Sequence, residues 1–306
     1  MPFGYPLVTC VRYVPSVPLL LTNDDGIDAE GLHVLARRFA AAGHDLIVAA
    51  PATDASGSGA ALGVFHADAH IDVRRMEIPD CDAPAWSVAG PPGLCTLAAR
   101  LGAFGPPPDV VVSGINAGLN TGRAILHSGT VGAALTAANF GAKGLAVSVA
   151  SPSQPQGTWQ WDGAATVALE VLDLLFDAPP RSVLNLNVPA LPRAEIKGLR
   201  WARLAAFGAV RAAMSEVETD GKLQIELRAT NEPLPPDTDT ALCEAGYATL
   251  TTLVGIAEAW PTEQARGTEG TEPNISPRPV PGAAFDPLHE IPDAGDSRTL
   301  RSRERA

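Results

Sequence analysis

Basic side chains are scarce in this sequence. Its 22 lysines and arginines are outnumbered by 34 aspartates and glutamates, which gives a formal net charge of −12. Proteins that bind nucleic acids usually carry a basic surface that neutralises the phosphates. The acidic charge balance of this sequence therefore argues against a nucleic acid as partner. A small anionic substrate would therefore need local help, from a metal ion or from the N-terminus of a helix.

Cysteines and long apolar runs are also few. The four cysteines lie far apart, with neither a C-x-x-C pair nor zinc spacing (Cys10, Cys81, Cys95 and Cys243), which is typical of a reducing cytoplasm. The apolar patch at 14–21 is interrupted by prolines and too short to span a bilayer, and no small-residue cleavage site follows it. We therefore expect a soluble cytoplasmic protein with no membrane association.

Apolar runs of strand length alternate with helical patterns through most of the chain, and 306 residues suffice for a full core. The predicted strands are 17–21, 45–51, 110–112, 145–150 and 183–189, and the predicted helices are 28–42, 92–103, 128–141 and 162–177. Asp28 is the expected N-cap of the first helix, and 62–90 is expected to form short strands or a hairpin. The β-α-β order predicts an α/β fold with a mostly parallel sheet flanked by helices.

The two ends of the chain differ from its middle. Residues 1–16 show no periodicity and are interpreted as an N-terminal extension, whereas 17–260 carries the α/β pattern as one domain. Near its end, a hairpin extension is expected at about 213–230, turning at Asp220-Gly221. A short helix and a closing strand should follow at 237–253. The tail at 261–306 is rich in proline, glycine and charge, which predicts disorder.

The stretch at 109–139 organises the predicted chemistry. A buried strand leads into a loop rich in glycine and asparagine, and a small-residue helix then begins at Ser128-Gly129-Thr130. Free backbone N–H groups, hydroxyls and the helix dipole would all point at the same place. The sequence therefore predicts that a phosphate binds at Ser128, Gly129 and Thr130.

Three predicted loops meet at the carboxyl edge of the sheet, where ligands of parallel α/β proteins gather (22–26, 52–59 and 113–130). They offer oxygen ligands, which favour Mg²⁺, Mn²⁺ or Ca²⁺ over zinc. Asp24 and Asp25 would repel each other unless a cation or a helix dipole compensates them. Helix capping is the alternative for the aspartates, and a left-handed backbone is the alternative for Asn116 and Asn120.

Three segments, at 19–39, 50–62 and 108–134, resemble in order and spacing the SurE family of survival-protein 5′/3′-nucleotidases. The resemblance implies a Rossmann-like α/β fold, one divalent metal ion per subunit and hydrolysis of nucleoside monophosphates. It assigns the metal to Asp24, Asp25, Ser56 and Asn116, and the phosphate to Asn120, Ser128, Gly129 and Thr130. It also implies a homodimer or homotetramer assembled through the C-terminal hairpin and exchanged segments.

This sequence departs from the family pattern in three places. The loop before Ser56 reads Thr53-Asp54-Ala55, His127 stands where a tyrosine is usual, and 90–95 reads Gly-Pro-Pro-Gly-Leu-Cys. The residues implied for metal and phosphate are unchanged, so the departures affect the surroundings that select the nucleoside. His127 is expected to be structural or to line the pocket.

The resulting hypothesis is a metal-dependent phosphomonoesterase that uses Mg²⁺ or Mn²⁺ on nucleoside 5′-monophosphates, with 3′-monophosphates left open. Asp24, Asp25 and Asn120 would be its catalytic residues. Two alternatives remain. One is a nucleotide-binding module without turnover, and the other is a phosphatase of the same fold that acts on polyphosphate or a phosphosugar. A substrate panel separates the three.

Overall fold

A computed structural model gives the structure of most of this chain. It describes residues 18–63, 70–154, 156–206, 210–214, 225–229 and 234–257. The predicted N-terminal extension, the predicted disordered tail and the turn at Asp220-Gly221 lie outside the described residues. Across the described part, no helix combines the length and the apolar character that crossing a lipid bilayer requires.

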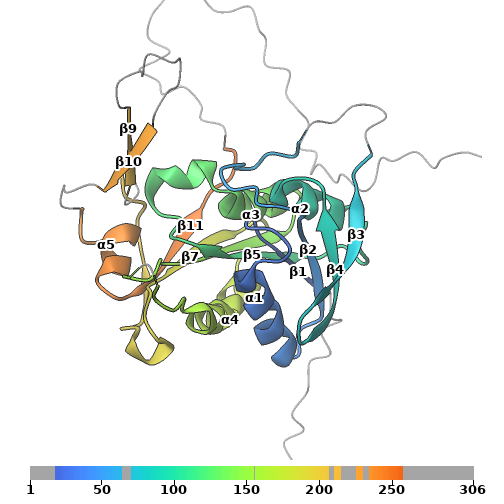
Figure 1. Cartoon of the computed structure of the whole chain (residues 1–306), viewed down its shortest axis with the longest axis horizontal. Coiled ribbons are helices and arrows are strands. Elements are labelled where there is room, and N and C mark those ends of the chain that lie inside the picture. Colours follow the sequence, from blue (N-terminus) through green and yellow to red (C-terminus); the bar gives the residue numbers. More distant parts are fainter. Residues whose placement is uncertain are drawn as a thin grey trace, which may run out of the picture. The chain divides into compact units, whose positions relative to one another are not determined.

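A nine-stranded sheet forms the centre of the fold, in the order β3-β4-β2-β1-β5-β6-β7-β11-β8 (Figure 1). Its strands are β1 (Leu19–Thr22), β2 (Leu46–Pro51), β3 (Val73–Ile78), β4 (Cys81–Val88), β5 (Val110–Ala117), β6 (Lys143–Val149), β7 (Val183–Val188), β8 (Leu199–Trp201) and β11 (Ala248–Leu253). Neighbours are parallel except for β3 with β4 and β11 with β7, which are antiparallel. The predicted α/β class with a mostly parallel sheet is confirmed, and the sheet is mixed.

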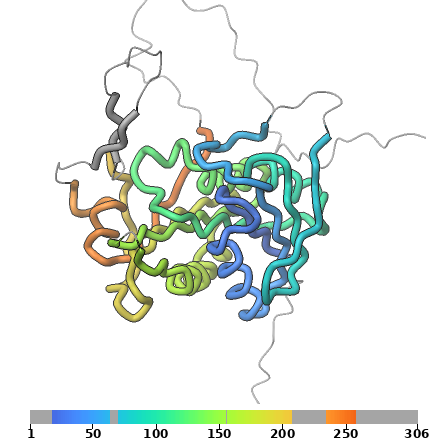
Figure 2. The backbone as a smooth tube through the Cα atoms, in the orientation of Figure 1, coloured from blue at the N-terminus to red at the C-terminus, as the bar shows by residue number. Residues whose placement is uncertain are grey.

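The chain begins at the centre of this sheet with β1, builds one half outward to β3 and β4, and returns to β5 beside β1 to build the other half. In Figure 2 the blue and cyan N-terminal strands lie on the right of the view, and the yellow and orange C-terminal strands lie on the left. The strand β5 joins the two halves, since it pairs with β1 on one side and β6 on the other. The residues of β5 and its neighbours therefore stand at the middle of the carboxyl edge.

Helices cover both faces of the sheet, with α1 and α4 on one face and α2 and α3 on the other (Figure 1). The helices are α1 (Glu30–Ala41), α2 (Pro92–Arg100), α3 (Gly129–Asn139), α4 (Trp161–Asp177) and α5 (Asp239–Glu244), with 3₁₀ turns η1 (Gly122–His127) and η2 (Arg193–Glu195). The N-cap of α1 is Ala29 and not the predicted Asp28, which is exposed. The chain turns at Gly26 first, with an Ala29 N–H to Gly26 carbonyl bond, and this delays the helix.

Two further predictions need correction at their boundaries. The strand predicted at 110–112 continues to Ala117, with a register shift between Ser113 and Asn116, so Asn116 sits on a strand and not in a loop. The predicted hairpin begins earlier than expected, because β9 (Val210–Met214) pairs antiparallel with β10 (Ile225–Ala229). Its connecting residues lie outside the described part.

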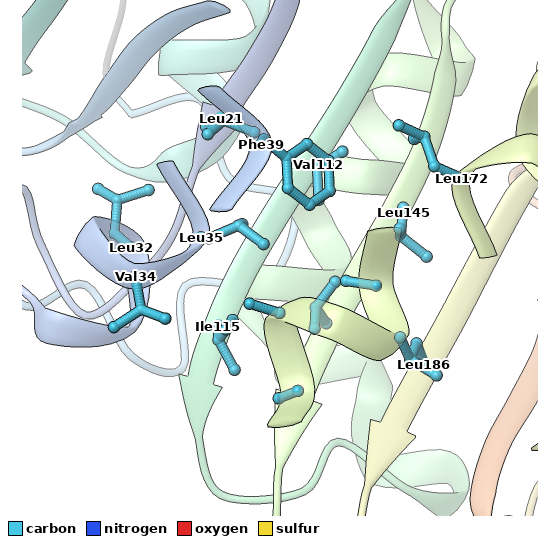
Figure 3. Close-up of a cluster of buried hydrophobic side chains, with 14 of the residues drawn as sticks. Leu21, Leu32, Val34, Leu35, Phe39, Val112, Ile115, Leu145, Leu172 and Leu186 are labelled. Atoms are coloured by element: carbon cyan, nitrogen blue, oxygen red, sulfur yellow. The ribbon is translucent and has the colours of Figure 1, made fainter. Parts of the chain in front are cut away.

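Large aliphatic side chains fill the space between the sheet and the α1/α4 layer. Leu35 and Phe39 of α1 point toward Val112 and Leu145 of the central strands, and Leu172 of α4 joins them (Figure 3). All five are at most 1% exposed. Each such side chain contributes roughly 1.5–3 kcal/mol when buried, so this layer carries much of the stability.

The opposite layer is packed with small residues. A Cβ on Gly132 of α3 would lie 2.0 Å from the Gly59 carbonyl oxygen, and one on Gly144 of β6 would lie 2.4 Å from the Ala134 carbonyl oxygen. Only glycine permits these approaches of backbone to backbone. The N-terminus of α3 is consequently pressed against the loop that follows β2.

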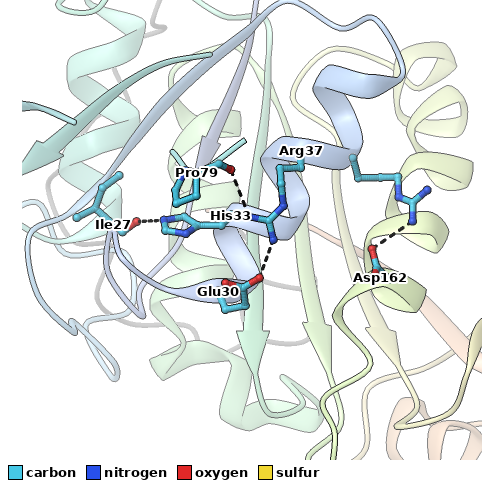
Figure 4. Close-up of polar contacts among 7 residues, drawn as sticks. Ile27, Glu30, His33, Arg37, Pro79 and Asp162 are labelled. Carbon is cyan, nitrogen blue, oxygen red and sulfur yellow. Dashed lines mark hydrogen bonds and ion pairs between the residues drawn. The ribbon is translucent and has the colours of Figure 1, made fainter. Parts of the chain in front are cut away.

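Polar contacts fix α1 and the loop that precedes it. The buried His33 ring bonds the Ile27 carbonyl oxygen at 2.9 Å, while Arg37 bonds Glu30 at 2.6 Å and the Pro79 carbonyl at 3.4 Å (Figure 4). The loop between β1 and α1 carries Asp24 and Asp25, so these contacts hold the aspartates on a rigid support. His33 is therefore a packing residue.

Candidate functional site

A cavity of about 590 Å³ opens at the carboxyl edge of the central strands. The loops after β1, β2 and β5 form it, together with Ala150 and Ser151 after β6. Six of the predicted site residues line this one cavity: Asp24, Asp25, Ser56, Asn116, Asn120 and Ser128. The other two, Gly129 and Thr130, are buried directly behind its wall.

Asp24 and Asp25 form an electrostatically strained pair. Asp24 is 3% exposed, and burial raises the pKa of its carboxyl above the ordinary value, against the hydrogen bond that Thr130 donates. Burial and then the charge of Asp24 raise the pKa of Asp25 to about 6. Among the described residues, none of the ion pairs involves either carboxylate. Within the described part of the chain, the pair therefore lacks a positive partner.

Asp54 adds a third negative charge that sequence reasoning missed. Hydrogen bonds from the Ser56 side chain and, at 2.8 Å, from the Ser56 N–H lower the pKa of the Asp54 carboxylate. The charge of Asp54 in turn further raises the pKa values of Asp24 and Asp25. The bond from the Ser56 N–H closes a turn that presents Ser56 to the cavity. Asp54, which departs from the family pattern, thus holds Ser56, which the pattern retains.

The oxygen donors around this pair fit a divalent cation. Two carboxylates, the Ser56 hydroxyl and the Asn116 amide are hard ligands of the kind that Mg²⁺ and Mn²⁺ take. Asn116 Nδ2 donates to the Gly118 carbonyl at 2.7 Å, so Oδ1 is the atom that the amide offers to a cation. No three histidines, cysteines or acidic residues of the described part are placed to hold one metal ion together, so a site here depends on serine and asparagine as well.

The N-terminus of α3 provides the complementary anion-binding features. Ser128 caps the helix, since its Oγ accepts from the Val131 N–H at 3.1 Å, and the other N–H groups of the first turn have no partner within the helix. A Cβ on Gly129 would lie 2.7 Å from both Asp24 Cβ and Ser58 Oγ. The hydroxyl and the backbone N–H of Thr130 both bond the Asp24 carboxylate, which leaves the Gly129 N–H of this turn to meet an added anion.

Asn120 is held on every side. Its backbone N–H and carbonyl bond the side chains of Asn185 and Asn187 on β7, and its side chain donates to Ser148 on β6. Sequence reasoning missed these three partners. A signal was available, because two asparagines inside an otherwise apolar buried strand are unusual and call for bonding partners.

The rest of the cavity wall is uncharged. Leu119, Thr121 and Ala124 line it, and His127 faces it from the end of η1. Among the described residues that line it, none is lysine or arginine. An anion in this cavity would therefore rely on the α3 N-terminus, backbone and amide groups, and a bound cation.

Comparison with known proteins agrees with this geometry. The family model described as survival protein SurE matches residues 19–209. The chain is 35% identical over 240 residues to "5′-nucleotidase SurE" of Synechococcus sp. (strain JA-3-3Ab), covering 77% of this chain and 90% of that protein. It is 35% identical over 242 residues to "5′/3′-nucleotidase SurE" of Erwinia tasmaniensis, covering 77% and 89%. The crystal structure of a SurE protein from Aquifex aeolicus matches 77% of this chain and 92% of that chain, with a TM-score of 0.64 and 27% identity.

Proposed function

This chain belongs to the SurE family, and from that premise we propose that it is a metal-dependent 5′-nucleotidase. It would hydrolyse nucleoside 5′-monophosphates to nucleoside and phosphate. The name of the Erwinia relative suggests 3′-monophosphates as a second substrate. The nucleotide would bind in the cavity that Asp24, Asn120 and Ser128 line.

One observation carries the proposal. A buried pair of carboxylates without a cationic partner in the described residues lies against the N-terminus of an eleven-residue helix, and both border one cavity. The first feature favours a cation and the second favours an anion. A phosphomonoester together with a divalent cation satisfies both at once, which neither a neutral ligand nor a bare anion does.

Each group of residues has a separate part in this proposal. Asp24, Asp25, Ser56 and Asn116 would hold the divalent ion, which when bound polarises a phosphoryl oxygen and makes a bound water more acidic. Asn120, Ser128, Thr130 and the backbone N–H of Gly129 would hold the phosphoryl oxygens in position. Stabilising the charge that shifts during phosphoryl transfer is mainly a matter of such positioning and electrostatics.

The test is phosphate release from a panel of nucleoside 5′- and 3′-monophosphates with Mg²⁺, with Mn²⁺ and with EDTA. We expect metal-dependent release that EDTA abolishes. Nucleotide binding by calorimetry without phosphate release would support a binding module instead. Phosphate release from polyphosphate or a sugar phosphate, with nucleotides left intact, would show a phosphatase with a different class of substrate. Either result overturns the proposal.

We also propose that the chain functions as a homodimer or homotetramer. The support is the antiparallel ribbon of β9 and β10, since the family resemblance implies assembly through a C-terminal hairpin. Light scattering of the purified full chain gives the molar mass directly. A mass equal to the 31.7 kDa monomer at all concentrations would contradict this part.

A further inference from the structure

Side chains of β7 hydrogen-bond both the backbone N–H and the backbone carbonyl of Asn120. Asn187 Oδ1 accepts from the Asn120 N–H at 2.9 Å, and Asn187 Nδ2 donates to the Asn120 carbonyl at 2.8 Å. Asn185 Nδ2 donates to the same carbonyl at 2.9 Å. One loop residue thus receives three hydrogen bonds from a strand 65 and 67 positions away in the sequence.

These asparagines occupy positions where an apolar residue would be expected. β7 lies between β6 and β11, and both Asn185 and Asn187 are 0% exposed. Leu184 and Leu186, on the opposite face of the strand, belong to the main hydrophobic core. Burying a primary amide is costly unless it is hydrogen-bonded, and Asn185 Oδ1 has no partner among the described residues. The sheet could pack without these amides, but the loop that carries Asn120 depends on them for its hydrogen bonds.

The side chain of Asn120 is oriented by the neighbouring strand. Its Nδ2 donates to Ser148 Oγ at 2.8 Å, and Ser148 is fully buried on β6. In the sheet register, Ser148 stands between Asn187 on β7 and Asn116 on β5. A single row across three strands therefore contains Asn116, proposed to hold the metal ion, and two groups that orient Asn120.

We propose that Asn187, with Asn185 and Ser148, is a positioning residue that fixes Asn120 for binding the phosphoryl group. This inference rests on the proposed function, because the part played by Asn120 belongs to it. The loop at 118–121 has no strand or helix of its own, so its place depends on these bonds. A displacement of about 1 Å at a positioning group can reduce an enzymatic rate roughly 100-fold.

The decisive variants are Asn187→Asp and Ser148→Ala. Asn187→Asp keeps the acceptor for the Asn120 N–H but sets a carboxylate oxygen against the Asn120 carbonyl. Ser148→Ala removes only the acceptor of the Asn120 side chain. Thr249→Val is the matched control, because Thr249 is the β11 neighbour of Asn187 in the register, is fully buried, and has a hydroxyl without a partner among the described residues.

For each variant, kcat and KM are measured with adenosine 5′-monophosphate, together with the affinities for inorganic phosphate and for Mn²⁺ alone. We expect KM and the dissociation constant of phosphate to rise about tenfold in Asn187→Asp and severalfold in Ser148→Ala. The Mn²⁺ affinity should stay at the wild-type value, since the proposed metal ligands are unchanged. Thr249→Val should match the wild type in all four quantities.

Lower thermal stability with unchanged KM and phosphate affinity would show a merely structural role and overturn the inference. If Asn187→Asp does not fold, Ser148→Ala decides the question alone. If the wild type binds phosphate but releases none from nucleotides, the proposed function fails while the phosphate affinities still test the positioning. A wild type that binds no phosphate overturns both.

Discussion

The two sides of the cavity are built on opposite principles. On the acidic side, burial raises the pKa of both Asp24 and Asp25, the charge of Asp24 raises that of Asp25 further, and neither carboxylate has an ion pair in the described structure. On the amide side, the backbone N–H, the carbonyl and the side-chain Nδ2 of Asn120 have partners at 2.8–2.9 Å. The acidic side should gain stability when a cation binds, whereas these groups of Asn120 are bonded beforehand.

This difference matches what each side would have to bind. A mobile cation can supply its own charge, so a site for it can leave carboxylates uncompensated until it arrives. A phosphoryl group in its transition state changes charge without time for the protein to rearrange, so its donors work best when they are already fixed. The two sides should therefore respond differently to substitution. Changes on the acidic side should alter metal binding, and changes on the amide side should alter phosphate binding and stability.

The largest effect is expected from Asp25→Asn on the acidic side. Removing one charge of the pair should lower kcat/KM about 10²–10³-fold and weaken Mn²⁺ binding, as loss of a single electrostatic group does in other enzymes. The metal-free protein should be no less stable, because repulsion with Asp24 is relieved. Asp28→Asn is the control, since Asp28 is exposed on the same loop and does not line the cavity.

Full activity with unchanged Mn²⁺ affinity in Asp25→Asn would remove the metal-anchoring role from this residue. Equal losses in Asp25→Asn and Asp28→Asn would show a general effect of charge and not a ligand. In either case the acidic side could no longer be described as a cation site that differs from the amide side.

Gly129→Ala should give the next largest effect, because Gly129 at the N-terminus of α3 packs directly against Asp24. The new methyl group would lie 2.7 Å from Asp24 Cβ and from Ser58 Oγ, so something must shift. We expect a loss of about 3 kcal/mol in the free energy of unfolding, the upper end for overpacking, together with reduced turnover. Denaturant titration and phosphate release measure the two.

Gly163→Ala is the matched control for that substitution. Gly163 is in α4, and its Cβ would make only ordinary contacts, the nearest at 3.5 Å. Helix propensity predicts a small gain in stability there. If Gly129→Ala were as stable and active as Gly163→Ala, the close approach of α3 to Asp24 would not be a constraint on the site.

Much of the acidic side could be predicted from the sequence, and much of the amide side could not. Asp24 and Asp25 follow directly after a buried strand, and local order alone places them at the carboxyl edge of a parallel sheet. The partners of Asn120 depend on β7 lying next to β6, a fact of strand order that no local pattern contains. The extension of β5 to Asn116 was missed for the same reason, since pairing with Ser148 overrides a loop-like composition.

Asp239→Asn should lower the stability of the fold more than it lowers turnover, because Asp239 supports the loop on the amide side. This fully buried carboxylate accepts hydrogen bonds from the N–H groups of Gly122, Ala205 and Thr240 at 2.8–3.0 Å, which ties the loop after Asn120 to α5. An amide in its place turns one acceptor into a donor that faces an N–H. We expect a loss of about 1–2 kcal/mol in denaturant titration.

The control for Asp239→Asn is Glu244→Gln, which neutralises an exposed carboxylate at the other end of α5. It should leave the unfolding midpoint unchanged. A stable Asp239→Asn with weakened phosphate binding would instead place Asp239 among the positioning residues. That result would sharpen the comparison by extending the amide side beyond Asn120.

The smallest effect is a pH dependence of the metal-free protein. The pKa of Asp25 is raised from 3.8 to about 6 in the folded state, so between these values the folded protein binds more protons than the unfolded chain. Stability in EDTA should therefore fall as the pH rises through this window and level off above it. Because Asp25 keeps part of its surface in solvent, screening limits the effect to about 1 kcal/mol, or roughly 2–4 °C in Tm.

Asp25→Asn isolates this contribution from the other carboxylates that titrate over the same range. The Tm of the wild type in EDTA should drop relative to that of the variant between pH 4 and pH 6, as the raised pKa of Asp25 requires. Added Mn²⁺ should reverse the difference, since the ion binds the deprotonated pair and stabilises it most where protons compete least. If the Tm of the wild type and of Asp25→Asn changed with pH in parallel in EDTA, the charge on Asp25 would not destabilise the metal-free protein. The acidic side would then resemble the amide side in having no unfavourable charge before a ligand binds.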